Sequence, residues 1–403
     1  MLGGNLSEKI RVRELTKIFG QNPKKAIPLL KDGLSKKEML DKTGLTVGVN
    51  RCSFDVEDGE LFVIMGLSGS GKSTLIRLIN RMIEPTYGDI FIDNENISEL
   101  DEVGLRKARR EKMSMVFQNF ALFPHYTILE NAAYGLSIKN GKNKNVNKKA
   151  KEALKLVGLE GYENQYPDQL SGGMQQRVGL ARALATDTDI LIMDEAFSAL
   201  DPLIRKEMQD ELVYLQSEMK KTVLFITHDL NEALKIGDKI AVMKDGSILQ
   251  IDSPEQLLSN PKNDFIREFV QDVDRTKVLT ASNIMIRPDT ININRHGPKA
   301  ALSKMLRSGN SSIFVVNNKR ELLGYVLAED ASNAYANGQK SLDCIIKKDM
   351  MTIDMDYPLE DIVADIQDAK IPISVIDGKV LKGIIIKGTV LAALSKDEVR
   401  NDE

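Results

Sequence analysis

The sequence predicts an α/β protein with more than one domain. Three short apolar runs, Leu61–Met65, Ile190–Met193 and Thr222–Thr227, have the length and continuous hydrophobicity of strands buried on both faces of a parallel sheet. Candidate helices follow these runs, so strands and helices alternate from about residue 11 to residue 272. The length of 403 residues also exceeds a single domain and predicts two or three.

Four helices are expected in this first part of the chain: Ser73–Met82, Lys148–Val157, Gly172–Thr186 and Ile204–Lys220. The polar stretch 140–151 (NGKNKNVNKKAK) contains asparagine and glycine, which favour turns. We therefore expect a surface loop in its first half and a helix that begins near Asn147.

The composition excludes several classes of protein. The net charge of −3, from 58 acidic and 55 basic side chains, argues against nucleic acid as the main partner. The two cysteines, Cys52 and Cys344, provide neither a disulfide framework nor a four-ligand zinc site. No apolar run approaches 18 residues and the N-terminus lacks the layout of a secretory signal, so we expect a chain that neither spans a membrane nor is secreted.

Beyond Pro261 the chain changes to two similar units of about 60 residues each. In both units a proline precedes a helix, and two strands follow the helix. These elements are expected at 299–306, 312–316 and 322–327 in the first unit and at 359–369, 373–376 and 381–386 in the second. The spacing from Val316 to Gly324 equals that from Val375 to Gly383, which supports a duplication. Two β-α-β-β-α units would form one small domain, because neither could easily bury its sheet alone; two unrelated α/β stretches are the alternative.

The segment 66–73 (GLSGSGKS) follows the strand Glu60–Met65 and opens a helix. Its glycines allow consecutive backbone N–H groups to point at phosphate oxygens beside the positive end of that helix. Lys72 is expected to reach the β- and γ-phosphates of a nucleotide, and the Ser73 hydroxyl to bind Mg²⁺. A flexible glycine-serine turn is the alternative, but the flanking strand and helix are the context that this phosphate loop requires.

Two acids, Asp194 and Glu195, end the apolar strand that begins at Ile190. Adjacent carboxylates at the end of a buried strand cost free energy unless a cation or substrate offsets them. Asp194 is expected to bind Mg²⁺ directly or through water, and Glu195 to act as the general base on the attacking water. Taken alone, the pair also fits a strand followed by an acidic helix cap.

A second helix start lies in the segment 170–177 (LSGGMQQR), where free backbone N–H groups are presented to an anion. Together with the phosphate loop, this string resembles the signature of ATP-binding cassette (ABC) ATPases. The other motifs of that family follow in order, with Gln118 in VFQN at the Q-loop, 198–201 (SALD) at the D-loop and His228 in ITHD at the switch histidine. The resemblance covers about residues 11–272 and implies a P-loop ABC ATPase domain with a RecA-like core, an antiparallel β subdomain and an α-helical subdomain.

In this family two such domains pair head to tail, and each ATP lies between the phosphate loop of one and the LSGG segment of the other. The resemblance therefore implies a homodimer that binds ATP and Mg²⁺. It also implies that His228 holds the γ-phosphate against Glu195 and that Gln118 senses the metal and the attacking water. The residues expected to contact the nucleotide are Phe19, Ser68, Gly69, Ser70, Gly71, Lys72, Ser73, Thr74, Ser171, Gly172, Gly173 and Asp201, and those expected at the metal are Ser73, Gln118 and Asp194.

Phe19 is the candidate for the aromatic residue that stacks on adenine in this family. Packing beside the first strand is the alternative for this ring. The lysine-rich segment 21–44 that follows Phe19 is not found in ordinary cassettes.

Over nearly its full length the chain resembles the ATPase subunit of glycine betaine/proline osmoprotectant importers. Its tail resembles tandem cystathionine β-synthase (CBS) modules, in which Gly324 and Gly383 lie between the second and third strands. The expected organisation is an ABC ATP-binding domain at residues 1–274 and a tandem CBS domain at 275–403, with repeats at about 280–338 and 339–400. The region 118–171 would form the helical subdomain that grips a permease, with 117–126 near the contact.

The resemblance implies an ATPase that powers import of a compatible solute through transmembrane permease subunits with a substrate-binding domain. Such a protein lies at the cytoplasmic face of the cell membrane. A soluble regulatory ABC ATPase that acts on a protein partner is the alternative.

The same resemblance implies osmotic control, either through ionic strength or through a nucleotide such as cyclic di-AMP at the CBS modules. Many CBS modules hold a ribose through an acid six residues after the glycine; Asp330 meets this after Gly324, whereas Thr389 stands in its place in the second repeat. A module for dimerisation or stability alone is the alternative.

Residues 139–155 contain seven lysines and one acid, Glu152, for a local net charge of +6. An anionic membrane surface would attract such a segment, and less strongly as salt rises. We expect it to sense ionic strength, with a solvated helix face as the alternative and the basic cluster Arg106–Lys112 as a rival site.

Overall fold

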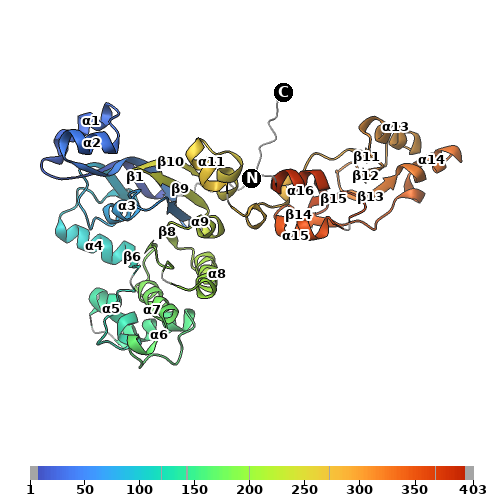
Figure 1. Ribbon diagram of the computed structural model, residues 1–403. Helices are drawn as coiled ribbons and strands as arrows, with labels where there is room; N and C mark the ends of the chain where they lie inside the picture. The colour runs from blue at the N-terminus through green and yellow to red at the C-terminus, as the bar shows by residue number, and fades with distance from the viewer. Residues whose placement is uncertain are drawn as a thin grey trace. The chain divides into compact units, whose positions relative to one another are not determined.

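The computed structural model describes residues 8–118, 120–141, 144–198, 200–271, 273–367 and 369–394, apart from the side chains of residues 140 and 144. The chain divides into two compact units, Met1–Val270 and Gln271–Glu403 (Figure 1). Each unit has its own hydrophobic core. Within the described ranges, every helix is too short or too polar to span a lipid bilayer.

The first unit is built around a six-stranded sheet with the strand order β10-β9-β3-β8-β7-β6. Its strands are β3 (Leu61–Met65), β6 (Met113–Val116), β7 (Ile190–Asp194), β8 (Thr222–Thr227), β9 (Lys239–Lys244) and β10 (Ser247–Asp252). β10 runs antiparallel to β9, and the other pairings are parallel. Every residue of β3, β7 and β8 is buried, as expected of strands covered on both faces. The three strands expected from the sequence are therefore present, each within one residue of its expected bounds.

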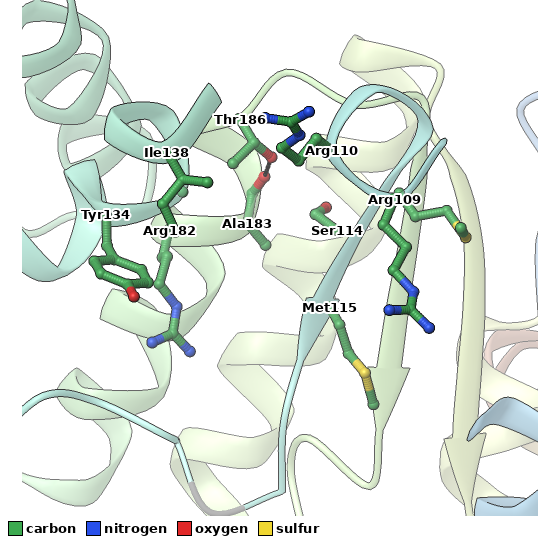
Figure 2. A pocket seen from close by; sticks show the side chains of 11 residues that line it. Arg109, Arg110, Ser114, Met115, Tyr134, Ile138, Arg182, Ala183 and Thr186 are labelled. Atoms are coloured by element: carbon green, nitrogen blue, oxygen red, sulfur yellow. Dashed lines mark hydrogen bonds between the residues drawn. The ribbon is translucent and has the colours of Figure 1, made fainter. Parts of the chain in front are cut away.

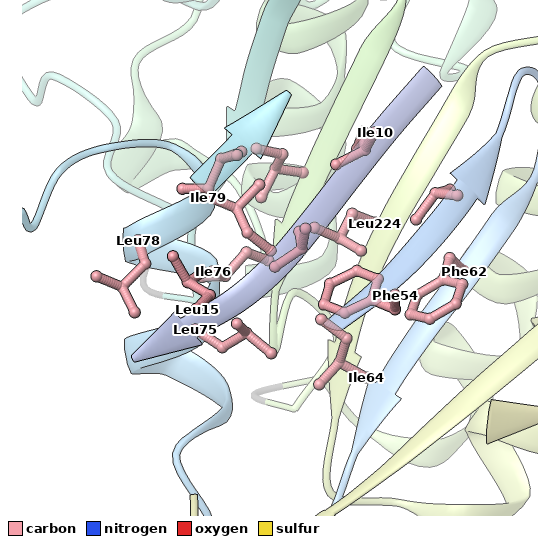
Figure 3. Packing of buried hydrophobic residues seen from close by; sticks show 14 of the residues in the cluster. Ile10, Leu15, Phe54, Phe62, Ile64, Leu75, Ile76, Leu78, Ile79 and Leu224 are labelled. Atoms are coloured by element: carbon pink, nitrogen blue, oxygen red, sulfur yellow. The ribbon is translucent and has the colours of Figure 1, made fainter. Parts of the chain in front are cut away.

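A four-stranded antiparallel sheet, β2-β1-β4-β5, shares its core with the parallel sheet. Its strands are β1 (Glu8–Phe19), β2 (Thr46–Glu57), β4 (Tyr87–Ile92) and β5 (Glu95–Asn96). Figure 3 shows the ring of Phe54 beside that of Phe62 of β3. Ile10 of β1 and Ile76 of α3 (Lys72–Ile79) belong to the same buried cluster. The rings of Phe54 and Phe62 stack with their centroids 5.1 Å apart. This core fixes α3, and with it the phosphate loop, to both sheets.

The segment 21–44 folds onto the antiparallel sheet. It forms η1 (Pro23–Ala26), α1 (Ile27–Lys31) and α2 (Lys36–Thr43). Buried Leu30 and Met39 pack against Ile18 and Val47 of the sheet, so the insertion is held by an apolar cluster of its own.

The remaining helices of the first unit are α4 (Glu102–Lys112), α5 (Ile128–Asn140), α6 (Lys144–Leu156), η2 (Pro167–Gln169), α7 (Gly172–Ala185), α8 (Pro202–Met219), α9 (Leu230–Ile236), α10 (Pro254–Ser259) and α11 (Asp264–Val270). Helices α5, α6 and α7 pack on one another. The expectation that a helix begins near Asn147 was wrong, because α6 begins at Lys144 and buries Val146 and Ala150. Tertiary packing here outweighs the local turn preference of asparagine and glycine. Helix α3 ends at Ile79 rather than Met82, since Arg81 has a left-handed φ of 54°.

The second unit contains two copies of a β-α-β-β-α arrangement, each with a three-stranded sheet, β11-β12-β13 or β14-β15-β16. The first copy comprises η3 (Arg275–Lys277), α12 (Ala281–Ile284), β11 (Thr290–Asn292), α13 (Pro298–Ser308), β12 (Ser312–Val316), β13 (Leu322–Leu327) and α14 (Ala328–Ala336). The second comprises η4 (Asp343–Ile345), β14 (Thr352–Asp354), α15 (Leu359–Asp365), β15 (Ile373–Asp377), β16 (Val380–Ile385) and α16 (Lys387–Leu394). The expected helix over 359–369 ends earlier, at Asp365, and residue 368 lies outside the described ranges.

Two expectations about the repeat were wrong in detail. Gly324 and Gly383 lie within β13 and β16, as the strands expected at 322–327 and 381–386 require, and not between the second and third strands as the CBS resemblance implies. Each strand continues through a close approach that a side chain would block. A Cβ at Gly324 would lie 2.3 Å from the Lys347 carbonyl oxygen, and one at Gly383 would lie 2.5 Å from Met285 Sδ.

The alignment of Val316 with Val375 is also shifted by one residue. Val315 and Val375 are the residues that pair with the two glycines. The turn after β12 is one residue longer, since Val316 pairs with residue 322, six positions on, whereas Ile376 pairs with residue 381, five positions on.

Candidate functional site

The ends of neighbouring parallel strands bring the candidate residues to one edge of the sheet. Met65 of β3 is paired with Thr227 of β8, and Ile226 of β8 with Asp194 of β7. Val116, the last residue of β6, is paired with Met193 of β7. Asp194 is the last residue of β7, and Glu195 follows it. The phosphate loop 66–73, His228 and Gln118 follow the ends of β3, β8 and β6.

The phosphate loop turns so tightly that glycine is required at two positions. Gly66 and Gly71 have φ of 152° and 105°, where side chains are strained. A Cβ there would lie 2.2 Å from the Met243 carbonyl oxygen and 2.4 Å from the Gly48 carbonyl oxygen, respectively. Lys72 Nζ donates back to the Gly66 carbonyl at 2.8 Å, so the loop curls around its own lysine.

Charge and burial inside the loop fit a phosphate group. Lys72 is 5% exposed; burial lowers the pKa of its ammonium, while the nearby Glu195 and Asp194 carboxylates raise it. Ser70 Oγ is buried with no hydrogen-bond partner among the described residues, and a buried hydroxyl normally has one. The other expected loop contacts lie around it, with Ser68 and Gly69 at the exposed tip and Thr74 in the first turn of α3.

Ser73 and Asp194 form a pair of oxygen ligands at the foot of the loop. Ser73 Oγ donates to Asp194 Oδ1 at 3.4 Å. Burial raises the pKa of Asp194 above its usual range, and Arg77 lowers it. A divalent cation would offset the cost of this buried carboxylate, and hydroxyl and carboxylate oxygens are the ligands that Mg²⁺ prefers.

Glu195 is contacted by polar side chains from two other strand ends. Gln118 Nε2 donates to Glu195 Oε2 at 3.2 Å, and His228 Nδ1 lies 3.4 Å from the same oxygen. Gln118 also donates to Ser198 Oγ at 3.4 Å. Glu195 has a left-handed φ of 46°, and its N–H donates to the Ile226 carbonyl at 3.1 Å. The three residues expected to be catalytic thus meet at one carboxylate, whereas Gln118, also expected at the metal, bonds to Glu195 and Ser198 instead of Asp194.

A buried network supports the segment that carries His228. Thr227 Oγ1 donates to Glu232 Oε2 and accepts from the Asp229 N–H at 2.9 Å. Gln209 of α8 donates to the other oxygen of Glu232 at 3.1 Å. Glu232 is 6% exposed, so these hydrogen bonds hold the loop after β8 to the interior.

The LSGG segment and the D-loop are held at helix starts. Ser171 Oγ accepts from the Met174 N–H at 3.3 Å and caps α7, while Asp201 Oδ1 accepts from the Ile204 N–H at 3.1 Å and caps α8. Gly173 packs so closely on Ile204 that a Cβ would lie 2.6 Å from its side chain. In the part of the chain that the structure describes, no hydrogen bond or ion pair joins Ser171, Gly172 or Gly173 to the phosphate loop. Residue 119 of the Q-loop and residue 199 of the D-loop lie outside the described ranges.

Phe19 lies beside the start of α3. Its ring would be 2.7 Å from a Cβ at Gly48, and the same Cβ would be 3.2 Å from Thr74. Phe19 is 41% exposed, and Lys17 Nζ lies 5.3 Å from the ring centroid. This position leaves part of the aromatic ring open beside the phosphate loop, and the stacking role stays a prediction.

Two basic residues that contact the motifs were not found by sequence reasoning. Arg205 of α8 donates to the Phe197 carbonyl at 3.2 Å and to the Leu200 carbonyl at 3.0 Å, and so holds the D-loop. Lys36 of the insertion donates to the Gly69 carbonyl at 3.2 Å. Both act on backbone carbonyls, which leave no pattern in a sequence.

Comparison with known proteins gives a consistent result. Residues 49–198 match the ABC transporter family model. The glycine betaine/carnitine transport ATP-binding protein of Listeria monocytogenes is 56% identical over 97% of this chain and 98% of its own length. The glycine betaine transport ATP-binding protein of Bacillus subtilis is 55% identical over 96% of this chain and 92% of its length. The glycine betaine/proline betaine transport ATP-binding protein of Escherichia coli is 45% identical over 98% of this chain and 99% of its own length.

Solved structures resemble the first part of the chain. An ATP-binding cassette solved as a dimer in a post-hydrolysis state with ADP and Pi is 34% identical, with a TM-score of 0.52 over 61% of this chain and 98% of that one. A subunit of a Clostridium perfringens ABC transporter complex is 26% identical, with a TM-score of 0.53 over 67% of this chain and 97% of that one.

The buried Glu232 predicts a pH-dependent stability for the first unit. Burial raises the pKa of Glu232 above its ordinary 4.5, against the hydrogen bonds from Thr227 and Gln209 that lower it. The folded state therefore binds this proton more tightly than the unfolded state, and the free energy of unfolding falls as pH rises from about 4.5 through the folded pKa. Glu232→Gln removes this contribution, so the variant should lose less stability than wild type between pH 4.5 and pH 7.

Urea unfolding of the full chain at several pH values measures this difference. Glu218→Gln, at an exposed position of α8, controls for the loss of one carboxylate on the same unit. Identical pH dependence in wild type and Glu232→Gln would contradict the raised pKa of Glu232.

Proposed function

Because the chain belongs to the ABC transporter family, among the ATP-binding proteins of glycine betaine transport systems, we propose that it hydrolyses ATP to drive import of a compatible solute. The expected ABC ATPase fold and ATPase activity are confirmed by the family match and by full-length relatives. Glycine betaine or a proline-like osmoprotectant is the solute class, in line with the names of those relatives. ATP and Mg²⁺ are the nucleotide and cation that the family uses.

The meeting of Gln118 and His228 at Glu195 Oε2 carries the catalytic assignment. Glu195 accepts the proton of the attacking water as general base. His228 holds the γ-phosphate against it, and Gln118 orients the water. Lys72, Ser70 and the loop amides would bind the phosphates, and Ser73 and Asp194 would hold Mg²⁺, which would neutralise charge on the phosphates.

Two copies of the chain are needed for a complete site. Ser171, Gly172 and Gly173 present a capped helix start with backbone N–H groups, and the described residues link them to α8 rather than to their own phosphate loop. In the proposed homodimer this segment and Asp201 complete the ATP site of the partner subunit. ATP closes the dimer, and hydrolysis reopens it.

The permease partner would be engaged through the helical subdomain. A pocket of about 240 Å³ lies between α4–β6 on one side and α5–α7 on the other, lined by Tyr134, Ile138, Arg109 and Arg182 among others (Figure 2). Tyr134 and Ile138 give this pocket an apolar wall that suits the apolar face of an amphipathic segment of a transmembrane permease subunit. Arg109 and Arg182 bond to backbone carbonyls of their own chain and are not part of this contact. This contact would place the ATPase at the cytoplasmic face of the membrane.

The second unit is proposed to act as a tandem CBS module that binds cyclic di-AMP. Its duplicated β-α-β-β-α units support this assignment. Asp330, the expected ribose ligand, pairs with Lys347 at 2.8 Å, so a ligand there must compete with this ion pair. Thr389 accepts from the Ile386 N–H at 3.2 Å at the start of α16 and carries no charge. The two halves therefore differ in their capacity to hold a ribose.

The lysine-rich segment is proposed as the sensor of ionic strength toward an anionic membrane surface. Local pairing reduces its free charge, because Lys149 lies 3.7 Å from Asp187 and Lys155 lies 3.2 Å from Glu160. Lys148 is 77% exposed and faces Glu152 at 3.9 Å, a pair worth little in water. Lys142 and the side chain of residue 144 lie outside the described part of the chain. In the rival cluster, Arg106 pairs with Glu102 at 3.0 Å and Lys112 with Glu95 at 2.8 Å.

Replacing the general base tests the catalytic assignment. Glu195→Gln should lower ATP turnover by about a hundredfold to ten-thousandfold, while Mg²⁺–ATP binding stays intact because the phosphate loop is unchanged. Lys72→Ala should instead lose binding, and Glu218→Gln should retain both. Turnover and binding of a fluorescent ATP analogue are measured on the full chain. Normal turnover in Glu195→Gln would overturn the role of this residue.

Calorimetry tests the ligand of the second unit. The full chain carrying Lys72→Ala, in which the ATP site is disabled, is titrated with cyclic di-AMP, and with AMP and ATP as controls. We expect saturable binding of cyclic di-AMP near micromolar affinity or tighter, with one ligand for two chains. No heat with cyclic di-AMP would contradict this proposal and leave the ATPase assignment untouched.

A further inference from the structure

Helix α7 contacts the loop that follows Gln118 along much of its length. A Cβ at Gly172 would lie 3.8 Å from the Phe120 ring, and one at Gly179 would lie 3.6 Å from the Phe120 carbonyl oxygen. Near the end of the helix, Arg182 Nη2 donates to that carbonyl at 3.0 Å and Nη1 donates to the Ala121 carbonyl at 2.6 Å. The planar guanidinium thus grips two consecutive peptide groups of the loop.

The two residues whose carbonyls accept from Arg182, Phe120 and Ala121, have a strained backbone conformation. Phe120 and Ala121 have φ of 55° and 48°, in the left-handed region that is strained for residues other than glycine. Two hydrogen bonds to a charged donor can offset this strain. The loop conformation and the arginine are therefore coupled.

Arg182 makes its polar contacts with this loop. Burial lowers the pKa of its guanidinium, which nevertheless stays charged in any protein. No carboxylate of the described residues pairs with it, so the two carbonyl dipoles are its polar partners. It lines the pocket shown in Figure 2, next to Tyr134.

We propose that Arg182 is a positioning residue for ATP hydrolysis, which holds the Phe120–Ala121 turn so that Gln118 meets Glu195. Gln118 lies two residues before the first gripped carbonyl, and its side chain bonds to Glu195 at 3.2 Å and to Ser198 at 3.4 Å. Arg182 does not touch the nucleotide. The inference rests on the proposed roles of Gln118 and Glu195.

The grip also links the two ATP sites of the proposed dimer. The first residues of α7 are Gly172 and Gly173, which complete the site of the partner subunit, and its Arg182 end holds the loop of its own site. A shift of α7 would therefore move the LSGG segment and the Gln118 loop together.

Steady-state kinetics of the full chain test the proposal. Arg182→Gln should lower kcat at least about tenfold, because a misplaced catalytic group slows the reaction by such factors. KM for ATP should change less than about twofold, because the phosphate loop and Phe19 keep their contacts. In a Gln118→Ala background, Arg182→Gln should cause no further loss, since both changes remove the same contact.

Arg109→Gln is the matched control. Arg109 lines the same pocket and grips two consecutive carbonyls in the same way, at Asn80 (2.9 Å) and Arg81 (2.5 Å), away from the Gln118 loop. This variant should lose comparable thermal stability and keep its kcat. If Arg182→Gln does not fold, Arg182→Lys replaces it, because the lysine keeps the charge and loses the planar fork.

A wild-type kcat in Arg182→Gln, an equal loss of kcat in Arg109→Gln, or losses that multiply in the double variant with Gln118→Ala would each overturn the proposal. If instead Gln118→Ala and Glu195→Gln both turn over ATP normally, the proposed catalytic site has failed, a result that is separate from the role of Arg182.

Discussion

The register of the parallel strands is the constraint on which the rest of the site depends. β3, β8, β7 and β6 are paired so that their carboxyl ends lie at one edge, and every residue of the first three is buried. A strand buried on both faces cannot slip without exposing apolar side chains and breaking its ladder. The phosphate loop, the Asp194–Glu195 pair and His228 inherit this fixed spacing. The side chains at this edge are therefore positioned by hydrophobic burial of the strands that carry them. The core around α3 fixes the phosphate loop as well.

The same edge concentrates buried charge. Lys72 and Asp194 are both buried. Burial lowers the pKa of Lys72 and raises the pKa of Asp194, so it favours the neutral form of each group. Such a site is costly on its own and becomes favourable when phosphate and a divalent cation supply the missing charges.

The hydrogen bonds around Glu195 link this carboxylate to two helices of the first unit. Gln118 and His228 come from two other strand ends and converge on Glu195. Arg182 of α7 bonds to the loop after Gln118, and Arg205 of α8 bonds to the segment that follows Glu195, in both cases through backbone carbonyls. Both helices are thereby joined by hydrogen bonds to segments that reach the Glu195 carboxylate.

The sequence alone predicts the elements whose physics is local. The three buried strands, the glycine-rich loop and the helix start in segment 170–177 follow from apolar runs and from glycine. The start of α6 does not, because burial of Val146 and Ala150 outweighs the turn preference of the preceding asparagines. The place of Gly324 within a strand depends on the approach of the Lys347 carbonyl, which is distant in sequence. Arg182, Arg205 and Lys36 bind backbone carbonyls, which any residue type provides, so no motif marks their partners. Spacing between repeats likewise cannot reveal a turn that is one residue longer in one copy.

Each ATP site of the proposed dimer is shared between two copies of this chain, and complementation of two inactive variants tests this sharing most directly. Lys72→Ala disables the phosphate loop, and Ser171→Arg disables the segment offered to the partner subunit. Each variant alone should be inactive, because both sites of its homodimer carry a defect. A mixture of the two should regain ATP turnover, since a mixed dimer contains one site with an intact loop and an intact LSGG segment. A mixture that stays inactive while the two chains demonstrably associate would contradict the shared site and place hydrolysis within a single chain.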